Sequence, residues 1–378
     1  MDLGLSEQQE MLKKSAREFL DKECPKTLVR AMEEDSKGYS PELWKHMSEL
    51  GWLALVFPEQ YGGTGNNFLD LCVLIEEMGR FLVPGPFFST VVLCGLPILK
   101  HGTDAQKKEF LTKIANGDVI LAYAQTEPSA TWSSSGVQLQ ATAKGKDFVL
   151  NGTKLFIPYA HVADYLLVVA RTQKPAANSD GGITLFLVDA KSQGITYEQL
   201  KTIGSDHQSE IVFKDVRVPA ANVLGKPNEG WAIVQQIMTW GAAGKCAEMV
   251  GGAQKVLEMS VDYAKQRVQF GRPIGSFQAI QHHCANMVTD VDGSRYIAYE
   301  AIWKVSEDMD ASKEVSMAKA WVSDAYRRVC ALGHQIHGGI GFTKEHDMQL
   351  YFRRAKAAEL AFGDGDYHRE LVAQQLGI

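Results

Sequence analysis

Arg267-Val268-Gln269-Phe270-Gly271-Arg272-Pro273-Ile274-Gly275-Ser276-Phe277-Gln278 is the stretch that decides the fold of this 378-residue chain. On either side of it, apolar residues recur with helical spacing, over residues 231–266 and 277–306. Two further helical patterns cover residues 312–332 and 348–375. Helices of this length usually pack as a bundle, so we expect a C-terminal four-helix bundle over residues 226–378. The glycines of the first helix could kink or subdivide it; they are Gly241, Gly244, Gly251 and Gly252.

Before the bundle, residues 119–225 consist of short β-rich runs separated by turn residues. We predict strands over residues 119–125, 137–143, 148–156, 165–171, 183–188, 195–200 and 210–218. Lys144-Gly145-Lys146-Asp147 and Asn151-Gly152 are typical of hairpin turns, and residues 174–182 of an exposed loop. So many short strands indicate a small β-barrel or sandwich.

The first part of the chain, residues 1–118, has helical signals. Ser6 and Gln9 have capping-box spacing, and Pro25 ends the helix that they begin. Ser40 followed by Pro41 predicts a second start, with its stop at Gly51. Further helices are expected over residues 68–78, with Gly79 at the end, and over 104–115. The chain is therefore predicted to be an α+β protein of three domains, 1–118, 119–225 and 226–378, without the βαβ alternation of a Rossmann fold.

Composition excludes several classes of function. The sequence is 45% hydrophobic with a net charge of −6, so it has no basic field to attract nucleic acid. Its six cysteines form no CxxC pair or metal-ligand spacing, and His282-His283 is expected to be a surface or interface pair, so no metal site is predicted. Reduced thiols and a polar, acidic N-terminus unlike a signal peptide favour the cytoplasm. No apolar run approaches the roughly 20 residues that span a bilayer.

Five segments, in this order along the chain, resemble acyl-CoA dehydrogenases. They are residues 122–128 (AYAQTEP), 151–157 (NGTKLFI), 213–219 (FKDVRVP) continuing through 222–225 (NVLG) to 228–231 (NEGW), 267–278, and 335–342 (QIHGGIGF). The resemblance covers essentially the whole chain. It implies the fold of that family and FAD as cofactor, together with an acyl-CoA substrate.

The resemblance also implies which residues hold FAD. Strand residues Tyr123, Gln125 and Thr126 would touch the flavin ring, and Phe156 would pack on it. Trp132 and Asp364 lie in segments that match cofactor-side positions. The remaining candidates, which would reach the adenosine-diphosphate part or the FAD of a neighbouring subunit, are Arg267, Gln269, Phe270, Gln278, Gln335 and Gly339. Arginine suits phosphate, and glycine permits close backbone approach. The functional unit would then be at least a dimer, and a homotetramer or heterotetramer is expected.

The catalytic base does not follow the family pattern. Most members use a glutamate that precedes a glycine on a late helix, and that place is held here by Phe362. Some relatives carry the glutamate on the first long helix after the β-domain, and that place is held by Gly241. Phenylalanine and glycine cannot accept a proton. The nearest acids in sequence are Asp364 and Asp366, which either serve as a relocated base or bind the cofactor's ribose.

Several hypotheses follow from this departure. The chain is either a dehydrogenase with a relocated base or one subunit of a heteromeric dehydrogenase whose partner carries the glutamate. Alternatively it is a flavin-dependent eliminating enzyme acting on an acyl-CoA, or a non-catalytic partner that binds CoA thioesters. An electron-transfer flavoprotein is the acceptor that the resemblance implies.

The acyl pocket is expected to involve Phe87, Phe88, Ser89 and Leu93, which indicate an apolar acyl group. No Arg or Lys occurs between Leu82 and Leu99, which disfavours a dicarboxylate anchored on that segment. Tyr159 and His161 lie beside the flavin-strand match, and a pocket role is one reading of them.

Overall fold

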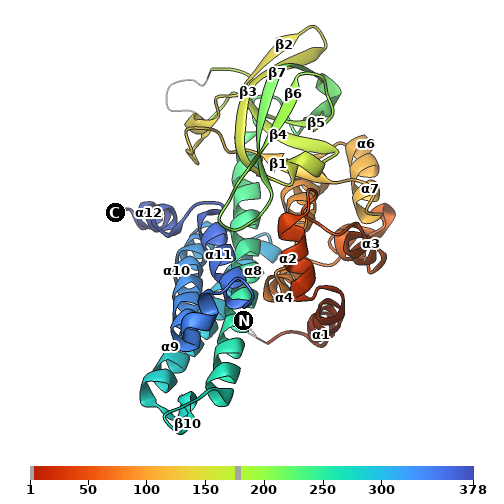
Figure 1. Ribbon diagram of the computed structural model, residues 1–378. Helices are drawn as coiled ribbons and strands as arrows, with labels where there is room; N and C mark the ends of the chain where they lie inside the picture. Colours follow the sequence, from red (N-terminus) through yellow and green to blue (C-terminus); the bar gives the residue numbers. More distant parts are fainter. Residues whose placement is uncertain (1–3, 175–179) are drawn as a thin grey trace.

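The computed structural model describes residues 4–174 and 180–378, and its elements run helical, then β, then helical (Figure 1). Residues 175–179 of the loop predicted over 174–182 lie outside the described part. The α-helices are α1 (Glu7–Glu23), α2 (Lys26–Glu34), α3 (Pro41–Glu49), α4 (Phe68–Phe81), α5 (Leu96–His101), α6 (Asp104–Gln106), α7 (Thr112–Ala115), α8 (Trp231–Gln266), α9 (Gln278–Ser306), α10 (Ser312–His337), α11 (Met348–Leu360) and α12 (Gly365–Leu376). Two π-helical stretches, η3 (Phe88–Gly95) and η4 (Lys107–Leu111), continue the helical runs of the N-terminal part.

The strands are β1 (Leu121–Ala124), β2 (Gln140–Lys144), β3 (Asp147–Pro158), β4 (Tyr165–Arg171), β5 (Ile183–Asp189), β6 (Ile195–Leu200), β7 (Gln208–Pro219), β8 (Val223–Leu224), β9 (Val268–Gln269) and β10 (Arg272–Pro273). The first eight form one sheet in the order β6-β7-β3-β2-β4-β5-β8, with β1 parallel to β4. The Lys144 turn closes the β2–β3 hairpin as predicted, with Gly145 at φ +66°. The prediction of a hairpin turn at Asn151-Gly152 was wrong. These residues form a bulge inside β3, where Asn151 donates its amide N–H to Asp215 Oδ1 at 3.2 Å.

The glycines of α8 do not break it, contrary to the sequence prediction. The helix runs unbroken through all four, because each lets another element approach closely. A Cβ on Gly251 would lie 1.8 Å from the Glu76 carbonyl oxygen of α4, and one on Gly252 would lie 2.3 Å from Tyr326 Oη of α10. The prediction that α4 ends at Gly79 was also wrong, because this glycine likewise permits the close approach of another helix. That helix continues to Phe81, and a Cβ at Gly79 would lie 2.0 Å from the Glu248 carbonyl oxygen.

The last predicted helix, 348–375, is wrong as a single element. It divides into α11 and α12 around Phe362 and Gly363, both of which have positive φ (59° and 93°). A non-glycine residue with positive φ cannot continue a right-handed helix. In Figure 1, α12 projects from the side of the bundle opposite the N-terminal helices. The break therefore places a turn, and not a helix face, beside α8.

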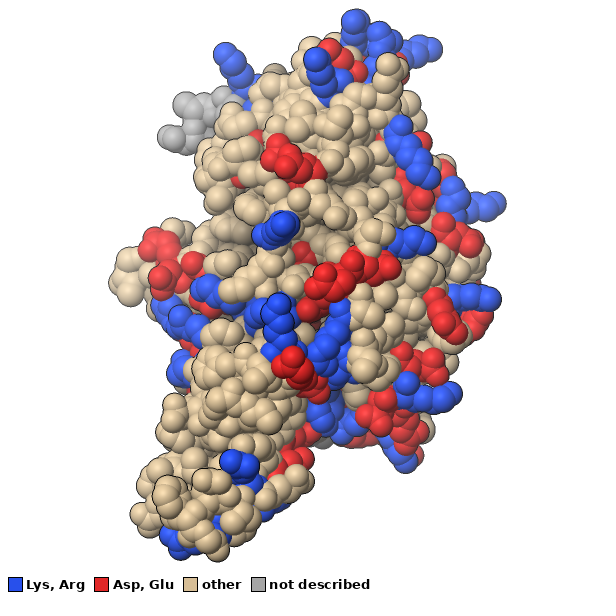
Figure 2. Space-filling view, viewed as in Figure 1, with Lys and Arg blue, Asp and Glu red and all other residues tan. Residues whose placement is uncertain are grey.

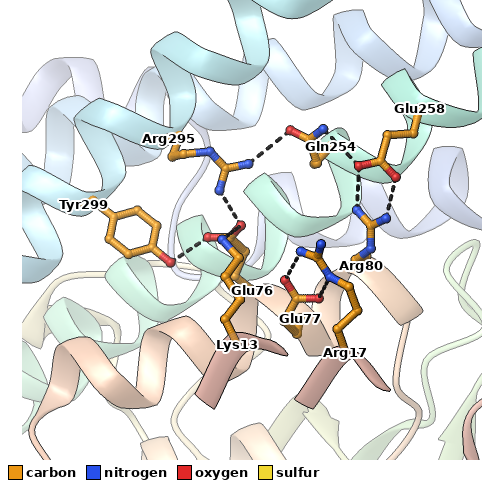
Figure 3. A network of polar contacts seen from close by, with 9 residues as sticks. All are labelled: Lys13, Arg17, Glu76, Glu77, Arg80, Gln254, Glu258, Arg295 and Tyr299. Carbon is orange, nitrogen blue, oxygen red and sulfur yellow. Dashed lines mark hydrogen bonds and ion pairs between the residues drawn. The ribbon is translucent and has the colours of Figure 1, made fainter. Parts of the chain in front are cut away.

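A buried ionic network joins the N-terminal helices to the bundle (Figure 3). At its centre Glu76 of α4 accepts hydrogen bonds from Lys13 of α1 and from Arg295 and Tyr299 of α9. Alongside, Glu77 pairs with Arg17, and Arg80 pairs with Glu258 of α8. A cavity of about 140 Å³ lies among these side chains. Four elements distant in sequence are thus tied together by charge as well as by apolar packing.

The outer surface carries charges of both signs. Figure 2 shows them interspersed over most of the visible face, while the lower tip of the bundle is dominated by uncharged residues. That tip contains the β9–β10 hairpin (Figure 1), in which Phe270 is 92% exposed and Val268 is 52% exposed. Among the described residues, no helix combines the length and the apolar character that crossing a bilayer requires.

Candidate active site

Strand β1 and the turn that follows it carry three of the predicted cofactor residues. Tyr123 is buried in the strand, and its hydroxyl donates to Gln125 Oε1 at 3.1 Å. The Thr126 carbonyl accepts from the Leu155 N–H at 2.9 Å, which docks the turn against β3. Gln125 and Thr126 therefore present a polar edge directly beside the strand that bears Phe156.

A buried ion pair fixes this turn. Lys154 is fully buried, and its ammonium donates to Glu127 Oε1 at 2.7 Å and to the Gln125 carbonyl at 2.9 Å. The Glu127 carboxylate also accepts from the N–H groups of Gln138 and Leu139. Burial lowers the pKa of Lys154 to about 8, and the Glu127 carboxylate opposes that shift. Both residues lie within the segments that carry the resemblance, but the sequence reasoning assigned them no role. The available signal was a lysine inside a strand pattern, since lysine is rarely buried without a partner.

Phe156 lies at a bulge in β3, where the register with β7 shifts between Lys154 and Ile157. Its φ of +57° is unfavourable for a residue with a Cβ, at a cost on the order of 1 kcal/mol or more. The bulge leaves the ring 51% exposed. An aromatic face held outward by strained backbone, next to the polar Gln125–Thr126 edge, fits a planar heteroaromatic ring whose rim carries hydrogen-bonding atoms. These residues fit the flavin that the sequence implies.

Trp132 lies in the loop between β1 and β2, with its ring centroid 6.4 Å from that of Tyr367 on α12. The contact brings the loop over the region where α11 and α12 separate. Trp132 therefore connects the β-domain to the turn that contains Phe362.

The remaining predicted cofactor residues lie elsewhere. Arg267, Gln269 and Phe270 belong to the exposed β9–β10 hairpin, and Gln278 begins α9. Gln335 is exposed near the end of α10, and a Cβ on Gly339 would meet nothing within 4 Å. The stacked rings of Tyr263 and His337, 4.5 Å apart, connect this glycine turn to the end of α8 that leads into the hairpin. In Figure 1 the hairpin lies at the end of the bundle farthest from the β-domain. Within one chain, the cofactor residues around Phe156 therefore lie apart from those of the hairpin.

Gly241 and Phe362, the two places where the sequence pattern expects a base, lie against each other. A Cβ built on Gly241 would lie 2.6 Å from Cε1 of the Phe362 ring. The Phe88 ring of η3 packs on the same phenylalanine, with centroids 5.9 Å apart. The Phe362 ring therefore occupies the space beside Gly241.

The turn around Phe362 is held by two buried polar side chains. The Lys319 ammonium donates to the carbonyls of Glu359 and Gly363, both at 2.9 Å, and to Ser323 Oγ at 3.1 Å. Burial lowers the pKa of Lys319 to about 8. His368 Nε2 lies 2.9 Å from the Phe362 carbonyl, so this nitrogen carries the hydrogen. Burial, with a contribution from Lys319, lowers the pKa of His368 to about 4. Sequence reasoning gave neither residue a role, although His368 ends the run of residues 362–368 (FGDGDYH), which resembles paired subunits of heteromeric dehydrogenases.

Asp364 and Asp366, proposed from sequence as relocated bases, have other partners. Asp364 Oδ1 caps α12 by accepting the Tyr367 N–H at 2.9 Å. Asp366 pairs with Arg369 at 2.8 Å, and its side chain is 92% exposed. One carboxylate is therefore engaged as a helix cap and the other as the partner in an exposed ion pair. Tyr159 is buried with its hydroxyl accepting the Gly85 N–H at 2.9 Å, and the His161 ring contacts that of His207.

Comparisons with known proteins agree with this architecture. Three consecutive family models match the chain: acyl-CoA dehydrogenase N-terminal domain at residues 6–118, middle domain at 122–216 and C-terminal domain at 228–377. The caffeyl-CoA reductase-Etf complex subunit CarC of Acetobacterium woodii is 32% identical, with 98% of each chain covered. The chain belongs to the acyl-CoA dehydrogenase family. It is an enzyme of the class that acts on CH–CH groups, and its family consists of flavoproteins.

Two solved structures illustrate the range of the family. Butyryl-CoA dehydrogenase from Megasphaera elsdenii superimposes with a TM-score of 0.92 at 32% identity, covering all of both chains. The ChsE4-ChsE5 complex from Mycobacterium tuberculosis gives a TM-score of 0.91 at 28% identity, covering 100% of this chain and 99% of the other. The helical, β and helical architecture predicted from the sequence is therefore confirmed.

Proposed function

We propose that this chain is an FAD-dependent oxidoreductase that forms the α,β double bond of an acyl-CoA thioester, with a proton acceptor that is not the usual glutamate. The observation that carries the second part is the contact of Phe362 with Gly241, which leaves no carboxylate at either expected place. When bound, FAD would supply the hydride acceptor, at N5 of its ring, for the hydrogen of the substrate's β carbon.

The chain's own residues would bind and orient the reactants. Phe156 would pack on the ring, with Tyr123, Gln125 and Thr126 along its polar edge and Trp132 covering it from the adjoining loop. Asp364, as the cap of α12, lies on the cofactor side of the Phe362 turn in this proposal. Phe362 and Phe88 would exclude water from the reacting carbons, and a dry site strengthens every polar interaction made there.

The second group of residues would serve the site of a neighbouring subunit. Arg267 would bind the pyrophosphate, and Gln335 with the open Gly339 backbone would contact the adenosine part. The other members of the group are Gln269, Phe270 and Gln278. The separation of these residues from Phe156 within one chain supports this arrangement, as does the exposure of Phe270 at the tip of the bundle.

Intersubunit complementation tests the shared site. Arg267→Met and Phe156→Ala, expressed separately, should each lose bound FAD. Coexpressed, they should regain it in part, because some sites then combine two unaltered halves. Mixed assemblies that remain without FAD would show that each site is built from one chain.

Flavin reduction tests the reaction. Purified protein should carry FAD, and anaerobic addition of a panel of acyl-CoA thioesters should bleach its absorbance. If the protein carries FAD and no thioester bleaches it, alone or with a partner chain, the oxidoreductase proposal fails. We propose an electron-transfer flavoprotein as the physiological acceptor, in line with the CarC relative, and the cytoplasm as the location, in line with the free cysteines.

A heteromeric enzyme is the second candidate. It is favoured by Phe362 at the base position and by the similarity to a ChsE4-ChsE5 complex. In this reading a paralogous subunit would supply the glutamate. Purification from the native host should then yield a second acyl-CoA dehydrogenase chain at one-to-one stoichiometry. A homotetramer with full activity would rule this reading out.

A further inference from the structure

The polar cavity between the N-terminal helices and the bundle has no lining residue in common with the candidate active site. Its volume is about 140 Å³, roughly ten times the space that one water molecule needs. The side chains around it come from α1, α4, α8 and α9, and Figure 3 shows them converging. The cavity therefore has room for a small ion together with some of its water.

The lining of this cavity carries more positive than negative charge. Its cations are Lys13, Arg17, Arg80 and Arg295, and its carboxylates are Glu76, Glu77 and Glu258. Two charges act on this group from outside the lining, Lys255 on Glu258 and Asp292 on Arg295, and they cancel each other. Lys26, which interacts electrostatically with Arg80, adds a further positive charge. At least one positive charge is therefore without a counterion among the described residues.

The cations also carry more hydrogen-bond donors than the carboxylates can accept. Three guanidinium groups and one ammonium have about 18 N–H hydrogens, whereas three carboxylates accept at about 12 sites. Arg17 donates from Nε and Nη2 to Glu77, and its Nη1 takes no part in that pair. The Lys13 ammonium donates one of its hydrogens to Glu76 at 3.0 Å. Donors on α1 are therefore left for a further acceptor.

The exposure of the side chains distinguishes the mouth of the cavity from its floor. At the mouth, Arg17 is 45% exposed and Glu258 is 33% exposed, whereas Glu76 and Glu77 on the floor are 3% and 1% exposed. Both floor carboxylates are already paired with cations. Pockets for drug-sized ligands usually measure about 300–1,000 Å³. A cavity of about 140 Å³ that is open at one side thus suits a smaller solute.

We propose that this cavity binds a small tetrahedral oxyanion of the phosphate type between Lys13, Arg17 and Arg80, and that the bound anion stabilises the packing of α1 and α4 on the bundle. Guanidinium groups donate to phosphate through fixed pairs of N–H groups, and an ammonium group acts on it as a point charge. An anion in this place neutralises the remaining positive charge and gives the spare N–H groups an acceptor. The inference does not depend on the proposed dehydrogenase function.

Calorimetric titration of inorganic phosphate into the FAD-loaded protein at constant ionic strength tests the site. We expect one phosphate per chain and a thermal unfolding midpoint that rises with phosphate concentration, since a ligand of the native state stabilises it. Chloride should give neither effect. Lys13→Met should weaken phosphate binding about tenfold to a hundredfold, the loss expected for a charged hydrogen bond, and Lys13→Arg should retain it. Lys14→Met changes a neighbouring lysine that is 79% exposed, and this matched control should bind phosphate as the wild type does.

Glu258→Gln distinguishes an anion site from a network that only stabilises the fold. This change removes a negative charge at the mouth, so it should tighten phosphate binding about threefold, although it lowers the unfolding midpoint in the absence of phosphate. The proposal is overturned if the wild type binds no phosphate, if chloride has the same effect, or if Lys13→Met and Glu258→Gln change the affinity in the same direction. Circular dichroism of each variant before titration checks the fold. If Glu258→Gln does not fold, the comparison of Lys13→Met with Lys13→Arg decides the question.

Discussion

Replacement of Glu76 by Gln should destabilise the fold strongly, because this carboxylate is the centre of the network in Figure 3. Its side chain is 3% exposed, and it accepts from Lys13 at 3.0 Å, from Tyr299 at 2.5 Å and from Arg295. An exposed ion pair contributes at most about 1 kcal/mol. Removing one partner of a buried network leaves the others charged without compensation, at a cost of about 3–5 kcal/mol. The neutral amide of glutamine cannot balance the charges of Lys13 and Arg295. We therefore expect the loss that is typical of a buried network, about 3–5 kcal/mol.

The measurement is the unfolding free energy of Glu76→Gln, followed by circular dichroism in urea at pH 7. Glu18→Gln on α1 is the matched control, since its pairing with Lys14 spans 4.0 Å between exposed side chains, and it should change stability by less than about 0.5 kcal/mol. A double-mutant cycle with Arg295→Gln should give a coupling of about 0.5–3 kcal/mol. A loss below 1 kcal/mol for Glu76→Gln would refute the reasoning that the network is screened from solvent.

The same carboxylate makes stability depend on pH. Burial alone would raise the pKa of Glu76, but Arg295, Lys13 and the Tyr299 hydroxyl together hold it below its ordinary value of 4.5. The native state therefore binds the proton less readily than the unfolded state. Its contribution is present above pH 4.5 and is lost as the pH falls below that value. Glu76→Gln should lack this part of the acid destabilisation.

Three further predictions concern the candidate site. Phe362→Glu, with FAD bound, should raise the rate of flavin reduction by octanoyl-CoA about a hundredfold in the isolated chain, as expected for a positioned base. Phe362→Leu is the control and should give no such gain. An unchanged rate for Phe362→Glu would mean that a base already acts elsewhere in the chain. Lys154→Met should leave Glu127 buried and unpaired, destabilise the fold by about 3–5 kcal/mol and lower the FAD content per subunit. Lys144→Met, which changes an exposed lysine, should retain both the stability and the FAD content. Undiminished FAD content in Lys154→Met would show that the ion pair does not organise the turn. Burial lowers the pKa of His368 from 6.5 to about 4, so this side chain binds a proton more readily in the unfolded state. Its contribution to stability should therefore be lost as the pH falls from 6.5 to 4. At 1.36 kcal/mol per pKa unit, the loss is about 3 kcal/mol. His368→Gln should flatten that part of the pH–stability profile, and an unchanged profile would contradict the burial argument.

Long elements could be predicted from sequence because their signals are local. The bounds of α8 and the start of α1 at Ser6 follow from apolar periodicity and a capping box, which act within a few residues. Local signals of this kind are sufficient to predict that the chain is first helical, then β and then helical again. The missed helix α2 begins directly after Pro25, where the sequence prediction saw only the end of α1. Proline suits the start of a helix as well as a stop.

The candidate site was predictable only in part. The segments that resemble the family contain Gln125, Thr126 and Phe156, but the strain at Phe156 and the ion pair between Lys154 and Glu127 depend on how β3 packs on β1 and β7. Spacing along the chain cannot show that a lysine of one strand lies 2.7 Å from a glutamate in the turn after another strand. Burial decides which charges must be paired, and burial is a property of the assembled fold.

The sequence by itself determined the family, the order of the domains and the absence of glutamate at positions 241 and 362, since each of these follows from residue identity and order along the chain. Only the tertiary structure decided that those two positions are one place, filled by the Phe362 ring against Gly241. It also decided that the glycines of α8 serve close packing and that the last helix breaks at Phe362. The physical reason is the same in each case: steric contact between distant segments sets the local conformation, and local sequence carries no record of the partner.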